Sequence, residues 1–233
     1  MSGLRERQKA GRRSDILNAA SLLFRRGGFA ETRIEQIADR ARLSPATVYN
    51  YFASKGDLLL ALVALDGEEV RAAGAALIAD PPADPVTTVN RLLEGYVDHS
   101  LVHLDKRLWR QMMGTALSHA ETPIGSGYRA LDRKLAQQVT ALCRALRKRG
   151  DIPMSVECED AGQVLFYVCN SLFMEFVADD AMSLTSMKRR MSRQIRLVFA
   201  GLIGDAHAPE QGGNRATRKA RSVAAGSGGA PSP

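Results

Sequence analysis

The chain has 233 residues, of which 45% are hydrophobic, 24% charged and 6% aromatic, so it is long enough to bury a substantial core. No segment approaches the roughly 20 uncharged apolar residues of a membrane span, and the polar, basic N-terminus lacks the apolar run of a secretory signal. Three cysteines at spacings that match no zinc pattern indicate buried, reduced thiols in a cytoplasmic protein.

Positive charge is concentrated in the first quarter of the chain. The formal net charge is +7, and residues 1–56 hold 11 Lys and Arg against 5 Asp and Glu. Residues 57–204 hold 17 against 18 and are nearly neutral. Such a concentration is typical of a protein that binds a polyanion; the alternative is an ordinary solvated basic face.

Helical spacing recurs along the whole chain without a convincing period-two run, so we predict an all-α fold. A first helix has Ile16, Ala20 and Phe24 on one face and ends at Gly27-Gly28. A basic arm, residues 1–13, precedes it. An arm of this kind can be disordered in the free protein and lie along DNA when bound.

Two short helices follow, with almost no chain between them. Thr32 with Glu35 has the capping-box pattern that opens the first of them, and Ser44-Pro45 supplies an N-cap and a first-turn proline for the second. Only about two residues, Arg42-Leu43, separate them, which leaves no room for an antiparallel hairpin. The spacing therefore predicts a helix-turn-helix, with the element from Ser44 to Phe52 presented to the major groove of DNA.

A long helix is predicted to start at Ser54, again with a capping signature at Asp57, and to end before the prolines at 81, 82 and 85. Further helices are expected at about 86–103, 105–119, 127–149, 158–178 and 185–203. The domain organisation is then an arm (1–13), a DNA-binding domain (14–56), a helical ligand-binding and dimerisation domain (57–204) and a disordered tail (205–233) rich in Gly, Ala, Pro and Ser.

The residues of the second and third helices resemble a known family. The runs Thr32-Arg33-Ile34-Glu35-Gln36-Ile37-Ala38 and Leu43-Ser44-Pro45-Ala46-Thr47-Val48-Tyr49-Asn50-Tyr51-Phe52-Ala53-Ser54-Lys55-Gly56-Asp57-Leu58 are similar to the N-terminal signature of TetR/AcrR-type transcriptional regulators. The resemblance implies phosphate-backbone contacts by Thr32, Ser44, Thr47, Tyr51 and Lys55. It implies base-edge contacts by Arg33, Pro45, Ala46 and Tyr49. For any single residue the alternative is a cap, or a tyrosine packed into the helices.

The middle helices carry residues suited to a ligand pocket, and TetR-like proteins usually bind an effector in this region. Plain core packing is the alternative for these side chains. His99 and His103, spaced i, i+4, could share a metal ion, but a surface or core histidine pair is preferred, and no metal or cofactor is predicted. The candidate lining residues are Tyr96, His99, His103, Trp109, Met112, Met113, His119, Tyr128 and Phe166.

The last two helices are the predicted homodimer interface. Helix 158–178 is apolar nearly all round and needs cover on every side. Helix 185–203 offers an apolar stripe of Met187, Met191, Ile195, Val198 and Leu202. Paired across a two-fold axis, the two helices would form a four-helix seam, as in TetR-like dimers. The alternative is that both belong simply to the core.

No nucleophile elbow, phosphate-cradling loop or metalloprotease motif occurs, so no enzyme is predicted. The favoured hypothesis is a dimeric repressor that binds a palindromic operator in double-stranded DNA and is released by a small hydrophobic effector. The alternative is a TetR-like DNA-binding protein whose C-terminal domain docks a protein partner, without a cavity between residues 90 and 175. A helical interaction module that does not bind DNA is a third hypothesis.

Overall fold

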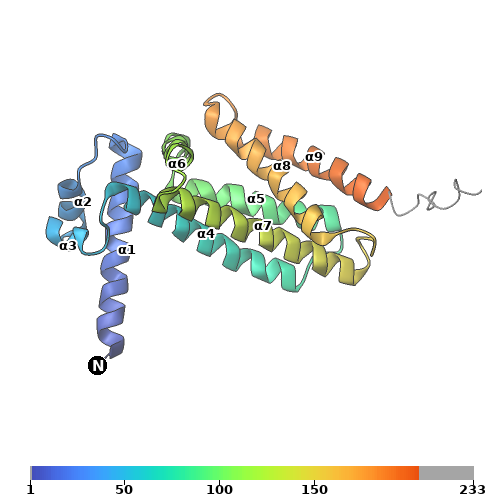
Figure 1. Cartoon of the computed structure of the whole chain (residues 1–233), viewed down its shortest axis with the longest axis horizontal. Helices are drawn as coiled ribbons and strands as arrows, with labels where there is room; N and C mark the ends of the chain where they lie inside the picture. Colours follow the sequence, from blue (N-terminus) through green and yellow to red (C-terminus); the bar gives the residue numbers. More distant parts are fainter. Residues whose placement is uncertain (1, 205–233) are drawn as a thin grey trace, which may run out of the picture.

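The computed structural model describes residues 2–204, and within that range it is a bundle of nine α-helices without a strand (Figure 1). The all-α prediction is therefore confirmed. Met1 and the predicted disordered tail, residues 205–233, lie outside the described residues. The helices are α1 (Ser2–Gly27), α2 (Ile34–Ala41), α3 (Pro45–Tyr49), α4 (Lys55–Ala79), α5 (Pro85–His103), α6 (Lys106–Ser118), α7 (Pro123–Arg149), α8 (Cys158–Ala178) and α9 (Leu184–Gly204).

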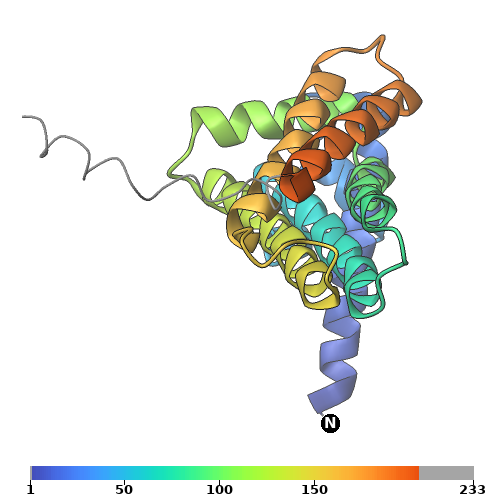
Figure 2. The ribbon, with the colours of Figure 1, turned by 90° about the vertical axis from the view of Figure 1, so that its right-hand side faces the viewer.

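The helices form a small N-terminal unit and a larger body that share one hydrophobic core. α1, α2 and α3 pack together at one end of the molecule, and α4 leads from them into the body, where it lies against α5 and α7 (Figure 1). α8 packs on α7 on one side and on α9 on the other. Viewed along the long axis, α1 projects beyond the body (Figure 2).

The basic arm is not irregular, because residues 2–13 continue α1 as a helix. This corrects the expected boundary between arm and first helix. Residues 3–15 are all exposed, so this part of α1 is a projecting basic rod rather than a packed element. Arg13 is the point where it meets the DNA-binding unit, with its guanidinium carbon 5.5 Å from the centre of the Phe52 ring.

The helix-turn-helix has the predicted short turn between α2 and α3, but α2 begins one residue later than expected. The N-cap of α2 is Arg33, whose N–H donates to the Gln36 side chain over 2.8 Å, so the expected Thr32–Glu35 pairing is wrong by one residue. α2 ends on Arg42 in the left-handed conformation (φ 57°), which reverses the chain at once. Ser44 then caps α3 as predicted, its hydroxyl accepting from the N–H of Thr47 over 3.1 Å.

α7 begins earlier than its sequence indicates. A helix was expected from about residue 127, but residues 123–126 also lie in the first turns of α7. A Cβ on Gly125 would lie 2.6 Å from the carbonyl oxygens of His119 and Ala120. The glycine thus permits the tight α6–α7 connection rather than marking a flexible loop.

The apolar stripe of α9 is used within the chain. Met187, Met191 and Ile195 are fully buried where α9 packs on α5 and α8. This corrects the prediction that these residues face a second protomer. Among the residues of the two helices whose burial the structure describes, the large apolar side chains that remain exposed are Val164, Tyr167 and Met174 of α8 and Leu197 of α9.

α8 is long and apolar enough, by length and composition alone, to cross a membrane, with a mean hydropathy of 1.3. This corrects the expectation that no segment approaches such a composition. Half of the apolar segment is buried inside the molecule, packed between α7 and α9, as in the central helix of a bundle. The three cysteines, Cys143, Cys158 and Cys169, are buried and free as predicted.

Candidate nucleic-acid interface and effector cavity

The exposed face of the helix-turn-helix carries most of the predicted DNA contacts. Arg33, Ser44, Pro45 and Ala46 are exposed, and Tyr49 is 52% exposed although it is a large aromatic residue. Val48 of α3 and Phe52 just after it are buried and hold this face outward. Guanidinium, hydroxyl and aromatic groups therefore share one solvent-facing surface.

Two other predicted residues lie at the edge of this surface. Thr47 is partly exposed, and its hydroxyl lies 2.8 Å from that of Ser44. Tyr51 is partly buried and packs against the core, which leaves only part of the residue for a phosphate. The two hydroxyls of Ser44 and Thr47 remain open to a further hydrogen bond from the solvent side.

Thr32 does not belong to the exposed surface. Its side chain is buried, with 3% exposed, and its hydroxyl lies 2.7 Å from the carbonyl oxygen of Gly28 and 3.3 Å from that of Leu23. The predicted phosphate contact is thus corrected: Thr32 closes the loop between α1 and α2. That loop starts at Gly28, whose φ of +93° favours glycine.

Lys55 fastens the same loop from the other side. Its ammonium group donates to the carbonyl oxygens of Phe29 and Ala30, each over 2.9 Å, and lies 5.0 Å from the centre of the Phe29 ring. The residue was predicted as a phosphate contact. In the free protein its charge instead holds the α1–α2 loop against the start of α4.

We expect Lys55→Met to lower the free energy of unfolding by about 1–2 kcal/mol, because two charge-assisted hydrogen bonds and a cation–π contact are lost while the apolar stem is kept. Urea unfolding monitored by circular dichroism measures the change. Lys9→Met removes the same charge from the exposed part of α1 and serves as control. Equal stability of the two variants would show that Lys55 does not fasten the loop.

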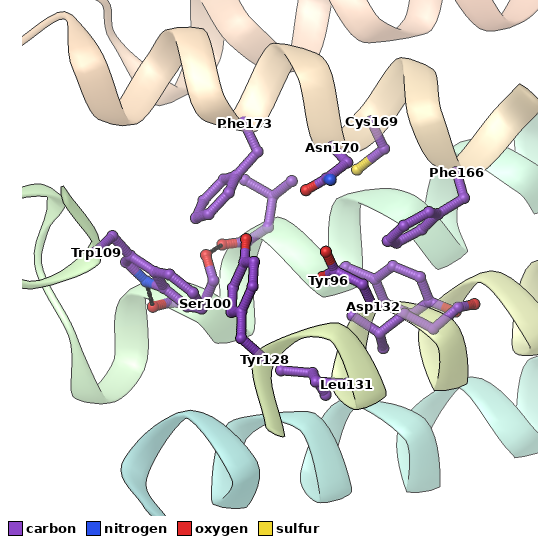
Figure 3. A pocket seen from close by; sticks show the side chains of 12 residues that line it. Tyr96, Ser100, Trp109, Tyr128, Leu131, Asp132, Phe166, Cys169, Asn170 and Phe173 are labelled. Atoms are coloured by element: carbon purple, nitrogen blue, oxygen red, sulfur yellow. Dashed lines mark hydrogen bonds between the residues drawn. The ribbon is translucent and has the colours of Figure 1, made fainter. Parts of the chain in front are cut away.

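A cavity lies in the body, between α5, α6, α7 and α8 (Figure 3). The space open to the centres of water molecules is about 60 Å³, which is enough for several waters or one small organic group. Its walls are mostly apolar and aromatic, with few polar groups, as is typical of ligand sites. The lining residues are Tyr96, Val97, Ser100, Trp109, Tyr128, Leu131, Asp132, Leu135, Phe166, Cys169, Asn170 and Phe173.

Four of the nine predicted ligand residues line this cavity: Tyr96, Trp109, Tyr128 and Phe166. Met112 and Met113 are buried core residues outside the lining. His119 is exposed at the end of α6, with its ring near the Thr115 carbonyl. His99 and His103 also lie outside the lining, so these five predicted residues do not line this cavity.

Three polar residues of the cavity, Ser100, Asp132 and Asn170, were not predicted from the sequence. Asp132 could have been found, because it follows Tyr128 by four residues and so shares its face of α7. Ser100 and Asn170 lie on other helices, and only the packing of those helices brings them to the same space.

The histidine pair has contacts within the protein. Among the side chains that the structure describes, no group of three or more His, Cys, Asp or Glu is arranged to hold a metal ion. Nε2 of His103 instead lies 3.8 Å from a carboxylate oxygen of Glu69 on α4, and the His103 carbonyl accepts a hydrogen bond from Ser21 of α1 over 2.7 Å. His103 therefore belongs to the junction between the N-terminal unit and the body.

The polar groups of the cavity differ in how far they are satisfied. The Tyr96 hydroxyl donates to Gln138 over 2.9 Å, and the Gln138 amide donates to the Arg71 carbonyl, which ties α5 to α7 and α4. Asp132, in contrast, has no hydrogen bond or ion pair to any residue between 2 and 204. Burial raises the pKa of its carboxyl to about 6, because the apolar surroundings disfavour the charged form.

The N-terminal part of the chain is similar to known bacterial regulatory proteins. Residues 16–62 match the model of the bacterial regulatory proteins of the TetR family. The chain is 31% identical over 118 residues to the HTH-type transcriptional regulator TcmR of Streptomyces glaucescens, and 32% identical over 102 residues to the HTH-type transcriptional repressor NicS of Pseudomonas putida. These matches cover 48% and 44% of the chain, and 50% and 48% of the two relatives. The chain thus matches about half the length of each.

The fold of the whole body has counterparts among solved structures. A TetR transcription regulator from Haloarcula marismortui superposes with a TM-score of 0.68 over 83% of this chain and 99% of that one, at 19% identity. The likeness at this identity concerns the fold alone, and it extends from the helix-turn-helix into the helices that enclose the cavity. The chain thus matches the TetR family model over residues 16–62, and its helical body has the fold of solved proteins described as TetR-family regulators.

Proposed function

We propose that the protein is a transcriptional repressor that binds a palindromic operator as a homodimer and is released by a small effector in the α5–α8 cavity. The proposed DNA binding is supported chiefly by the exposed face of α2 and α3. Arg33 and Tyr49 point to solvent there while Val48 and Phe52 are buried behind them. Such a face suits base edges and phosphates in the major groove.

The charge distribution supports the same function. The excess of Lys and Arg lies in residues 1–56. Arg5, Lys9 and Arg12 are exposed on the N-terminal part of α1, and this end of the helix projects beyond α2 and α3 (Figure 1). Phosphate neutralisation by such residues makes DNA affinity fall steeply with salt. The projecting part of α1 is therefore a second, sequence-independent contact to DNA.

The proposed dimer face is the exposed apolar surface of α8 and α9. Tyr167 is 59% exposed and Leu197 is 74% exposed, and both lie on helices whose opposite sides are buried in the protomer. Burial of such residues against a second copy would remove apolar surface from water. A dimer also places two copies of α3 on DNA, which a short recognition helix needs for useful affinity.

We expect the double variant Tyr167→Glu, Leu197→Glu to be a folded monomer, because four carboxylates would be buried in the two-fold interface without partners. Light scattering coupled to size-exclusion chromatography gives the mass directly. Leu117→Glu places one carboxylate at another exposed leucine, on α6, and should remain dimeric. A double variant with the mass of a dimer would show that the interface lies elsewhere.

α6 connects the cavity with the DNA-binding unit. Trp109 lines the cavity and its Nε1–H donates to the Ser100 carbonyl over 2.6 Å. Two residues earlier on the same helix, Arg107 donates to the Arg25 carbonyl at the end of α1 over 2.8 Å. Figure 1 shows α6 end-on, between α1 and the body. An effector that displaces Trp109 would therefore shift α6 against α1 and change how the two copies of α3 are spaced.

The presence of a cavity between residues 96 and 173 favours this function over a C-terminal domain that only docks a protein partner. The test is a screen of small hydrophobic compounds against the complex of full-length protein and its selected duplex. Fluorescence anisotropy reports release of the labelled DNA. We expect a subset of compounds to release the duplex and to alter the emission of Trp109, the one tryptophan of the chain. Release without any change in Trp109 emission would place the effector site elsewhere.

A further inference from the structure

The charge of the cavity indicates which class of effector it accepts. Asp132 is the only side chain of the lining that carries a full charge, and it is half-buried. Among residues 2–204 nothing donates a hydrogen bond to it or forms an ion pair with it. A carboxylate in apolar surroundings without a partner is unfavourable, so a ligand that supplies a positive charge would remove the penalty.

The remaining walls suit the rest of a cation. Five aromatic rings surround the space in which the Asp132 side chain lies: Tyr96, Trp109, Tyr128, Phe166 and Phe173 (Figure 3). Faces of such rings attract organic cations, and Trp and Tyr do so more strongly than Phe. Trp109 and Phe173 meet edge to face, with ring centres 5.2 Å apart, so these walls are held in place by their own packing.

An anionic effector fits less well. The cavity adjoins an outer hollow between α7 and α8, with Asp132, Phe166 and Asn170 lining both. That hollow contains three arginines: Arg129 donates to the Ala120 carbonyl, Arg144 is paired with Glu159, and Arg133 is exposed to solvent. An anionic head group would therefore compete with existing contacts at two of the three arginines and would also lie next to Asp132.

We propose that this cavity binds a small organic cation, with its charge against Asp132 and its apolar groups against the aromatic rings. This inference rests on the proposed function, in which the cavity is the effector site. Ionisation of Asp132 is required, so affinity should fall as the pH drops through about 6, the pKa of that carboxyl in the free protein. The other titratable or charged groups around it are Tyr96 of α5, Cys169 and Glu159 of α8, and Tyr128, Arg129, Arg133 and Arg144 of α7.

The experiment uses three probes of similar shape and different charge: benzyltrimethylammonium, its uncharged carbon isostere neopentylbenzene, and phenylmethanesulfonate. Each is titrated into the full-length protein, with Trp109 emission as the readout. We expect the cation to bind at least tenfold more tightly than the other two at pH 7.5. We expect its affinity to fall about tenfold at pH 5.

Asp132→Asn keeps the shape of the side chain. It should lower the affinity for the cation about tenfold or more and remove its pH dependence. The affinity for neopentylbenzene should stay within about threefold of wild type. Asp160→Asn removes one charge from an exposed position of α8 and should change nothing. Equal binding of the cation and its isostere, tighter binding of the sulfonate, or an Asp132→Asn protein that binds the cation normally would each overturn the proposal. These results would leave the effector site itself intact, whereas DNA that no hydrophobic compound releases would contradict the proposed function instead.

Discussion

Arg33→Ala combined with Tyr49→Ala is expected to weaken operator binding about 100-fold or more while the protein stays folded. Both side chains are exposed on the face formed by α2 and α3, and base-edge contacts contribute roughly 1–3 kcal/mol each to discrimination. Their removal in both protomers of a dimer compounds the loss. Anisotropy of a labelled duplex, selected from a random pool by the wild-type protein, measures the affinity at fixed salt.

The control for this variant is Met154→Ala, which truncates a side chain that is 78% exposed in the connection between α7 and α8. Thermal unfolding of the double variant should match that of wild type within about 0.5 kcal/mol, as is usual for exposed positions. Residual binding to unrelated duplex should remain, because phosphate contacts by other basic residues persist. Wild-type affinity in the double variant would show that this face does not read DNA.

Gly162→Ala is expected to lower the free energy of unfolding by about 2–3 kcal/mol, although alanine is the better helix former. Gly162 lies where α8 crosses α7. A Cβ there would come within 2.4 Å of Oγ1, 2.6 Å of Cα and 2.7 Å of the backbone nitrogen of Thr140. Backbone atoms cannot move aside like the end of a flexible side chain, so the two helices would have to separate. Urea unfolding gives the change in free energy.

Gly114→Ala is the matched control, because Gly114 also lies inside a helix but has no heavy atom within 4 Å of its Cβ position. We expect the free energy of unfolding of this variant to rise by about 0.5–1 kcal/mol, because alanine favours the helix and makes the unfolded chain less flexible. A loss at Gly162 and a gain at Gly114 would separate the effect of packing from that of helix propensity. If both variants gained stability, the close approach of α7 and α8 would not be a feature of the protein in solution.

The sequence was sufficient for the parts of the fold that are governed by local chemistry. Ser44-Pro45 and Ser54 start helices as predicted because capping depends on neighbouring residues alone. Val48 of α3 and Phe52, which follows that helix, are both buried behind the exposed face. The α2 cap lies one residue later than expected, because the Gln36 side chain accepts from the N–H of Arg33 while the N–H of Thr32 donates to the Gly28 carbonyl, and local pattern does not decide between the two registers.

Features set by tertiary packing could not be predicted. The apolar stripe of Met187, Met191 and Ile195 looks the same in sequence whether it faces its own protomer or a partner, and in the structure it faces its own. Thr32 and Lys55 carry the residue types of phosphate contacts, yet both bind backbone carbonyls of the α1–α2 loop. The backbone of Gly162 lies so close to Thr140 that no Cβ fits between them, and this closeness depends on how the two helices cross.

Recognition of DNA by a dimer is tested most directly by selection from a random-sequence duplex pool with the full-length protein, followed by sequencing of the retained DNA. Two copies of α3 related by a two-fold axis should enrich an inverted repeat with half-sites about one helical turn or more apart. The variant with alanine at positions 33 and 49 should enrich no sequence. Retained DNA without an inverted repeat, or a pool that passes through unchanged at low salt, would contradict the claim that this fold reads DNA as a dimer.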